Sequence, residues 1–194
     1  MSTPLRAAVI GVGHLGKHHA RILGTLPGVQ LVAAVDTVRE RAEAAASAIP
    51  GARAVTDAAE ILGEVDAVVV AVETVAHLAV ARQFLERGVH VLIEKPIATS
   101  VAEADILVEL AAQHGATLAI GHSERFNPAM TAARPLLVKP RFIEVHRLSG
   151  FPERSLDIDV VFDVMIHDLD IVLAVDGTDV VGVEAVGINV LTPK

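Results

Sequence analysis

Three glycines near the N-terminus have the spacing of a dinucleotide-binding loop. Gly11, Gly13 and Gly16 form the pattern G-x-G-x-x-G within the stretch GVGHLG. In such a loop the first glycine permits a tight turn, the second lets a pyrophosphate approach the backbone, and the third lets a helix pack closely on a strand. The N-terminus of that helix offers free N–H groups to the phosphates. Taken alone, the pattern also fits an ordinary glycine-rich turn.

An acidic residue stands where a ribose-binding carboxylate belongs. Asp36 follows Gly16 by roughly 20 residues, the distance at which a carboxylate accepts hydrogen bonds from the adenosine ribose hydroxyls. It would repel a 2′-phosphate, so NAD is favoured over NADP, although Arg39 is near enough to serve as a phosphate partner. Further candidates for cofactor contacts lie in the loop or after a later strand: His14, Leu15, Thr74 and His77.

A lysine follows the apolar run HVLI at 90–93. Glu94, Lys95 and Pro96 stand where this strand should end. Ligands of open α/β sheets bind outside the carboxyl ends of the strands, so Lys95 is expected to point into the nicotinamide crevice. Glu94 is expected to contact the nicotinamide ribose or to hold Lys95. A surface ion pair between Glu94 and Lys95 is the simpler alternative.

An aspartate and a histidine occur at positions i and i+4 of the stretch DVMIHDLD. Asp163 and His167 therefore share one face of a predicted helix. The alternatives are a buried histidine tied to its own helix and a carboxylate that starts the helix. His167 with Asp168 or Asp170 is the nearest approach to a metal pair, and the nine histidines show no ligand pattern. No metal site is predicted.

Short apolar runs alternate with longer amphipathic ones over the first 122 residues. Strands are expected at 7–13, 29–36, 52–55, 66–72, 90–93 and 116–121. Helices are expected at 14–24, 38–49, 57–63, 75–88 and from a Ser100–Glu103 capping box to about 114. Uninterrupted Val, Ile and Ala strands between helices indicate a parallel sheet covered on both faces. The predicted fold is α/β, with an N-terminal Rossmann doubly wound sheet.

The pattern changes after residue 122. The expected elements there are a strand at 141–149, a loop at 151–159, a helix at 160–175 and strands within 180–192. So few elements bury too little surface to be stable alone. The prediction is an NAD(P)-binding Rossmann domain over 1–122, followed by an incomplete α+β substrate and oligomerisation domain over 123–194. Either the second part packs on the first or on a partner, or the chain is a fragment.

Composition excludes several classes of function. The formal charge is −8 and only 3% of residues are aromatic, so a nucleic-acid partner is not expected. The absence of cysteine removes disulfides, thiolate metal sites and thiol nucleophiles. No run approaches the roughly 18 apolar residues of a membrane span, and the N-terminal apolar run lacks a signal-peptide cleavage pattern. A cytoplasmic protein without membrane contact is expected.

The combination of these motifs resembles the Gfo/Idh/MocA family of NAD(P)-dependent sugar, polyol and sugar-nucleotide dehydrogenases. The match includes the glycine loop, the acidic end of the second strand, the run from Ala71 to Ser100 with its E-K-P motif, and D-x-x-x-H on a later helix. The resemblance implies a catalytic triad of Lys95, Asp163 and His167. The stretch GHSERFNPA is similar to the branch that acts on UDP-linked N-acetylglucosamine-type sugars.

The resemblance implies a reversible alcohol oxidation. His167 would take the hydroxyl proton, Lys95 would donate a hydrogen bond to the developing alkoxide, and Asp163 would orient the imidazole. Arg125 and Asn127 are the candidates for substrate contact, and a homo-oligomer formed through the second domain is expected. This chain departs from the family in having DIDVVFD where glycines usually precede the D-x-x-x-H helix, and in being shorter.

Two other functions remain open on the sequence. A non-catalytic NAD-binding protein would need only the glycine loop and Asp36. A different Rossmann dehydrogenase, acting on an amino acid or imine, would need the same loop with another catalytic set. Neither requires Lys95, Asp163 and His167 together.

Overall fold

The computed structural model describes residues 3–148 and 159–188. The chain divides into two compact units, residues 1–121 and 122–194. Within the described ranges, no helix is both long and apolar enough to cross a bilayer.

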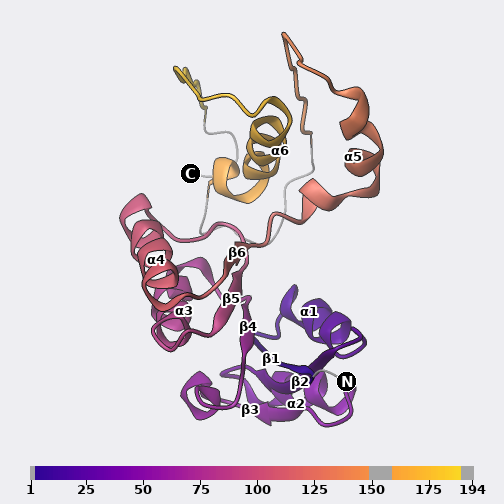
Figure 1. The fold of residues 1–194 in the computed structure, drawn as a ribbon, viewed down its shortest axis with the longest axis vertical. Coiled ribbons are helices and arrows are strands. Elements are labelled where there is room, and N and C mark those ends of the chain that lie inside the picture. The colour runs from indigo at the N-terminus through magenta and orange to yellow at the C-terminus, as the bar shows by residue number, and fades with distance from the viewer. Residues whose placement is uncertain (1–2, 149–158, 189–194) are drawn as a thin grey trace. The chain divides into compact units, whose positions relative to one another are not determined.

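The first unit is built on a six-stranded parallel sheet (Figure 1). Its strands are β1 (Leu5–Ile10), β2 (Val29–Val35), β3 (Arg53–Val55), β4 (Ala67–Val70), β5 (His90–Ile93) and β6 (Leu118–Ile120). They are ordered β3-β2-β1-β4-β5-β6, and every neighbouring pair is parallel. The chain thus runs outward from β1 to one edge, returns to β4 beside β1, and continues to the other edge. This is the doubly wound order, and it confirms the predicted fold class.

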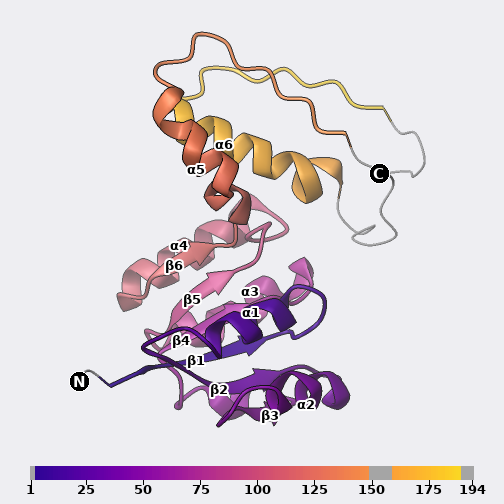
Figure 2. The same cartoon turned by 90° about the vertical axis from the view of Figure 1, so that its right-hand side faces the viewer.

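Helices bury both faces of this sheet. The main helices are α1 (Gly16–Leu23), α2 (Arg39–Ser47), α3 (His77–Leu85) and α4 (Val101–His114), with short turns η1 (Ala58–Ile61) and η2 (Thr74–Ala76) (Figure 2). Ala8 and Ile10 of β1 pack in one core cluster with Phe84 of α3, whereas Val9 between them packs in another with Ala20 of α1. Because both faces are covered here, the three successive residues Ala8, Val9 and Ile10 are all apolar.

Local chemistry sets the ends of these elements. β1 ends at Ile10, earlier than predicted, because Gly11 has φ +81 and leaves the strand conformation. Ser100 caps α4 as predicted, since its side chain accepts a hydrogen bond from the Glu103 N–H at 3.3 Å. The Glu103 carboxylate accepts from the Thr99 N–H at 3.0 Å. In a capping box it would accept from the N–H of the N-cap residue itself, Ser100, so this hydrogen bond is shifted by one residue.

The described part of the second unit is helical or irregular. It contains η3 (Ser123–Phe126), α5 (Pro128–Ala133), η4 (Arg134–Leu136), a π-helical turn η5 (Val161–Met165) and α6 (Ile166–Asp176), which confirms the helix predicted at 160–175. The strands predicted at 141–149 and within 180–192 are wrong for residues 141–148 and 180–188, which form none. A strand needs a neighbouring backbone to pair with, and within the described residues these segments have no ladder partner. The other residues of both segments, and 151–158 of the predicted loop, lie outside the described ranges.

Candidate active site

The three loop glycines differ in what surrounds them. A Cβ on Gly11 would lie 2.6 Å from the carbonyl oxygen of Ala71, and one on Gly16 would lie 1.7 Å from the carbonyl oxygen of Gly11. A Cβ on Gly13 would meet no atom within 4 Å. Gly11 and Gly16 therefore permit close packing of the loop, whereas Gly13 leaves its backbone open to a ligand such as a pyrophosphate.

Asp36 connects the loop to the end of β2. It is buried, with 8% of its surface exposed. Its Oδ2 accepts from the Val12 N–H at 3.1 Å, and its Oδ1 accepts from the Val38 N–H at 2.9 Å. A carboxylate has about four acceptor sites, so these two contacts leave others for a ribose diol. Asp36 thus holds the loop and keeps acceptor capacity for a ligand.

The remaining cofactor candidates differ in exposure. His14 and Leu15 are exposed just before α1, and Thr74 is buried at the start of η2. Contact between these three residues and a cofactor stays a prediction. His77 is 1% exposed, which leaves it almost no surface for a ligand.

Glu94, Lys95 and Pro96 follow β5 directly, at the carboxyl edge of the sheet. Lys95 is half-buried, and the peptide bond that joins it to Pro96 is cis. The Glu94 carboxylate lies 2.6 Å from Nε2 of His19 on α1. Glu94 therefore has a partner that the sequence did not predict.

In the second unit, Asp163 lies in the π-helical turn and His167 in the first turn of α6. Both are half-buried. The backbone N–H groups of Val161 and Phe162 donate to the side chain of Asp159 at 3.0 and 3.1 Å. Asp159 thus accepts from the first N–H groups of this helix, and Asp163 is an acidic residue in its first turn, which fits the alternative of a carboxylate that starts the helix. Single π-turns frequently mark functional sites.

His122 lies beside His167. Their ring centroids are 6.4 Å apart and the rings are nearly perpendicular, at 89°. His122 directly precedes η3, and η3 packs against α6. The turn after β6 therefore contributes a second imidazole next to the histidine of the predicted triad.

Asp170, one turn after His167, is paired with Arg125 of η3. Nε of Arg125 donates to Oδ2 of Asp170 at 2.9 Å, and a second guanidinium nitrogen contacts Oδ1. Burial acts to raise the pKa of Asp170, but the Arg125 hydrogen bond and the charges of His122, Arg125 and His167 outweigh it, so the pKa lies below its usual value. The same ion pair raises the pKa of Arg125.

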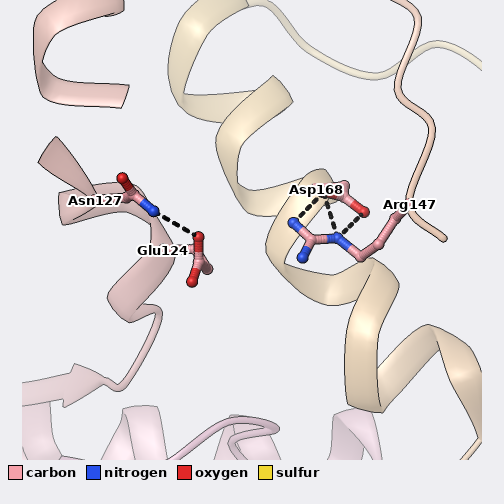
Figure 3. A network of polar contacts seen from close by, with 4 residues as sticks. All are labelled: Glu124, Asn127, Arg147 and Asp168. Atoms are coloured by element: carbon pink, nitrogen blue, oxygen red, sulfur yellow. Dashed lines mark hydrogen bonds and ion pairs between the residues drawn. The ribbon is translucent and has the colours of Figure 1, made fainter. Parts of the chain in front are cut away.

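A second arginine holds the neighbouring carboxylate of α6 (Figure 3). Nε of Arg147 lies 2.9 and 2.8 Å from the two carboxylate oxygens of Asp168. Asp168 and Asp170, considered above as metal partners of His167, are thus each paired with an arginine. Asn127 caps α5 through its Oδ1, which accepts from the Ala129 N–H at 3.0 Å, and its amide nitrogen donates to Glu124 at 3.3 Å. Substrate contact by Arg125 and Asn127 stays a prediction.

Two contacts were missed in the sequence, that of His19 with Glu94 and that of His122 with His167. Asp170 was considered only as a metal partner, and its ion pair with Arg125 was not predicted. Each of these contacts joins residues that are far apart in the chain. The only available hint was the occurrence of polar residues beside motif residues, as for Asp170 after His167. Such proximity predicts no particular partner.

Comparison with known proteins finds a matching family and similar sequences and structures. The model of the oxidoreductase family Gfo/Idh/MocA, an NAD-binding Rossmann fold, matches residues 5–122. UDP-N-acetylglucosamine 3-dehydrogenase of Acidithiobacillus ferrooxidans is 43% identical over 191 residues, which are 98% of this chain and 60% of the relative. A solved structure of that enzyme matches with a TM-score of 0.90 at 42% identity, over 98% of this chain and 63% of that one.

Two further relatives act on or bind different molecules. Inositol 2-dehydrogenase of Mycolicibacterium smegmatis is 33% identical over 177 residues, covering 86% of this chain and 51% of the relative. The structure of GenD2 from gentamicin A biosynthesis, solved in complex with NAD, matches with a TM-score of 0.67 at 34% identity, over 71% of this chain and 40% of that one. The chain thus spans between two fifths and two thirds of the length of these proteins.

Proposed function

Because the chain belongs to the Gfo/Idh/MocA oxidoreductase family, we propose that it is an NAD-dependent dehydrogenase acting on a hydroxyl carbon of a sugar nucleotide. The substrate class rests on the 43% identity to a UDP-N-acetylglucosamine 3-dehydrogenase. The similarity to inositol 2-dehydrogenases makes a free polyol the second candidate.

The glycine loop is the observation that carries this proposal. Gly13 has no atom within 4 Å of its would-be Cβ, while Gly11 and Gly16 are packed too tightly for any side chain. The buried carboxylate of Asp36 stands beside the loop with acceptor sites to spare. These residues fit the pyrophosphate and adenosine ribose of NAD. When bound, NAD+ supplies the acceptor for the hydride that leaves the carbinol carbon.

The proton chemistry falls to three side chains. His167 takes the proton of the substrate hydroxyl as general base, and Lys95 donates a hydrogen bond to the same oxygen as negative charge develops on it. Asp163 orients the imidazole. The C–O–H group thereby becomes a carbonyl, with its proton on His167. Lys95 belongs to the first unit and the other two to the second, so their convergence on one oxygen is part of the proposal.

A substrate screen tests the proposed function. The chain is mixed with NAD+ and, in separate reactions, UDP-N-acetylglucosamine, UDP-N-acetylgalactosamine or myo-inositol, and NADH formation is followed by absorbance. We expect NADH with a UDP-N-acetylhexosamine and little with myo-inositol. No NADH with any of the three, together with no effect of NAD+ on the melting temperature, would reject the proposal.

We also propose that copies of this chain associate into a homo-oligomer through the second unit. Apolar side chains of the second unit are largely exposed, among them Phe142 (81%), Leu148 (93%) and Val183 (82%). Apolar surface of this kind favours association with protein. Light scattering after size exclusion tests it, and a monomer at every concentration would contradict it.

A further inference from the structure

Lys95 lies between two residues that are each held by a histidine. Nε2 of His19 is 2.6 Å from Oε1 of Glu94, and Nδ1 of His77 is 2.9 Å from the carbonyl oxygen of Pro96. The histidines belong to different helices, α1 and α3. The residues before and after the lysine are therefore both fixed from outside their own segment.

The two histidines reach this segment from opposite faces of the sheet. Ala20, next to His19, is buried in the core cluster that α1 and α2 form with the sheet. Ala81, one turn after His77, is buried in the cluster that α3 and α4 form on the other face. Displacement of Glu94–Pro96 toward either face lengthens the contact on the opposite side.

His77 also links the segment to the neighbouring strand. Its Nε2 lies 3.1 Å from the carbonyl oxygen of Val72, just after β4. A carbonyl oxygen only accepts and a neutral imidazole has one N–H, so His77 donates to one of the two carbonyls, and the tautomer decides which. The ring is 1% exposed, so it has almost no surface for other contacts. It connects the chain leaving β4 with the chain leaving β5.

Glu94 is confined on its other side by Gly121. A Cβ on Gly121 would lie 2.8 Å from Oε2 and 2.9 Å from Cδ of Glu94. The Glu94 side chain is 12% exposed. Its carboxylate is thus enclosed between α1 and the end of β6, and the glycine provides the space that it occupies.

We propose that His19 and His77 are positioning residues for Lys95. His19 holds the side chain of the residue before the lysine and His77 holds the backbone carbonyl of the residue after it, so that the ammonium group of Lys95 is kept at one place at the carboxyl edge of the sheet. The proposal rests on the proposed function in one respect, that Lys95 meets the substrate oxygen. The fixation itself is independent of any substrate.

Two amide variants of His77 separate its two contacts. The amide nitrogen of asparagine lies one bond beyond Cγ, as Nδ1 does, so His77→Asn retains a donor for Pro96 and loses the contact with Val72. In His77→Gln the amide nitrogen lies two bonds beyond Cγ, as Nε2 does. This variant therefore retains a donor for Val72 and loses the contact with Pro96. His77→Gln should therefore disturb Lys95 more than His77→Asn, although both place an uncharged amide at the same buried position.

Lys95 is monitored by trace acetylation, read peptide by peptide in a mass spectrometer. Lys139 is an exposed lysine that also precedes a proline, and it serves as the reference within the same sample. Because Lys95 is half-buried, loosening of its segment should raise its labelling relative to Lys139. We expect a rise of about threefold or more in His77→Gln, as for a locally opened segment, and a smaller rise in His77→Asn.

Variants at His19 test the other side. His19 is 27% exposed, so its replacement leaves the core intact. His19→Gln keeps a donor for Glu94 and should label like wild type, whereas His19→Leu should raise the Lys95 ratio. His114→Gln, at an exposed position near the end of α4, is the matched control and should change nothing.

The readouts separate positioning from cofactor contact and from the proposed reaction. We expect NADH affinity to stay within about twofold in every variant, and turnover to fall about 10- to 100-fold in His77→Gln and His19→Leu, the loss that a displaced catalytic group causes. If wild type oxidises no sugar nucleotide, the proposed function fails while the labelling ratios still stand. Lys95 ratios in His77→Gln and His19→Leu equal to wild type would overturn the positioning proposal.

Discussion

Arg125 and Asp170, 45 residues apart in the chain, form a two-point ion pair that joins η3 to α6. The sequence suggested Arg125 as a substrate contact. The structure gives its guanidinium a buried carboxylate partner, since Asp170 is only 9% exposed. The pair lies one helical turn from His167, so it helps to set the position of that imidazole within the second unit.

The ion pair predicts a dependence of stability on pH. The pKa of Asp170 is lowered in the folded state, so its stabilising contribution is complete above the ordinary carboxyl pKa of about 4. That contribution is lost as the pH falls through the lowered folded value. Asp170→Asn should cost about 1–3 kcal/mol at neutral pH, the usual loss for a buried charged hydrogen bond.

Urea unfolding at neutral and acidic pH measures this difference. The difference in the free energy of unfolding between wild type and Asp170→Asn should be largest at neutral pH and should become smaller in acid. Asp176→Asn, an exposed change at the end of the same helix, is the control. A difference in the free energy of unfolding that increases on acidification would contradict a stabilising Arg125–Asp170 ion pair.

The sequence predicted the first unit well for physical reasons. The central strand Ala67–Val70 is buried on both faces, and this leaves a continuous apolar run that is visible without coordinates. Ser100 acts through Glu103, three residues later, and the types and spacing of Gly11 and Asp36 fit the pattern of a dinucleotide-binding loop, so these features are readable from the sequence. The Rossmann order then follows from the alternation of strands and helices.

The second unit was predicted less well because its signals were not local. Residues 141–148 alternate in polarity like a strand, but alternation describes one face of a sheet and does not supply a neighbour. The contacts of Arg147 with Asp168 and of Arg125 with Asp170 span 21 and 45 residues. Nothing in the spacing of such residues predicts that they meet.

A pair of alanine variants separates cofactor binding from folding. Gly13→Ala adds a methyl group where no atom lies within 4 Å, so the melting temperature should not change. NADH binding should weaken by about tenfold or more, roughly 1.4 kcal/mol, because the methyl group occupies the approach of the pyrophosphate.

Gly16→Ala should behave in the opposite way. Its Cβ would lie 1.7 Å from the carbonyl oxygen of Gly11, so backbone must move and stability should fall by about 1–3 kcal/mol, as in other overpacked sites. Thermal unfolding with NADH titration compares the two variants. Equal NADH affinity in Gly13→Ala and wild type would show that the loop does not hold the phosphates.

Asp36 should set the choice of cofactor. A carboxylate accepts from ribose hydroxyls and repels a 2′-phosphate, so wild type should bind NADH more tightly than NADPH. Asp36→Asn removes the charge and turns one acceptor into a donor, and it should lower the NADH affinity by about tenfold and reduce the preference. Fluorescence titration with both cofactors measures this. Tighter NADPH binding by wild type would point instead to Arg39 as a phosphate partner.

The transfer of deuterium from a labelled sugar nucleotide tests the central claim most directly. UDP-N-acetylglucosamine carrying deuterium on the hydroxyl-bearing carbons of its N-acetylglucosamine ring is incubated with NAD+ and the chain, and the reduced cofactor is analysed by mass spectrometry. We predict deuterated NADH with wild type and a loss of about 10²–10⁴ in rate with His167→Ala, the range for removal of a general base, with a comparable loss for Lys95→Ala and NADH binding retained in both. Formation of unlabelled NADH only, or wild-type rates in both variants, would contradict the account.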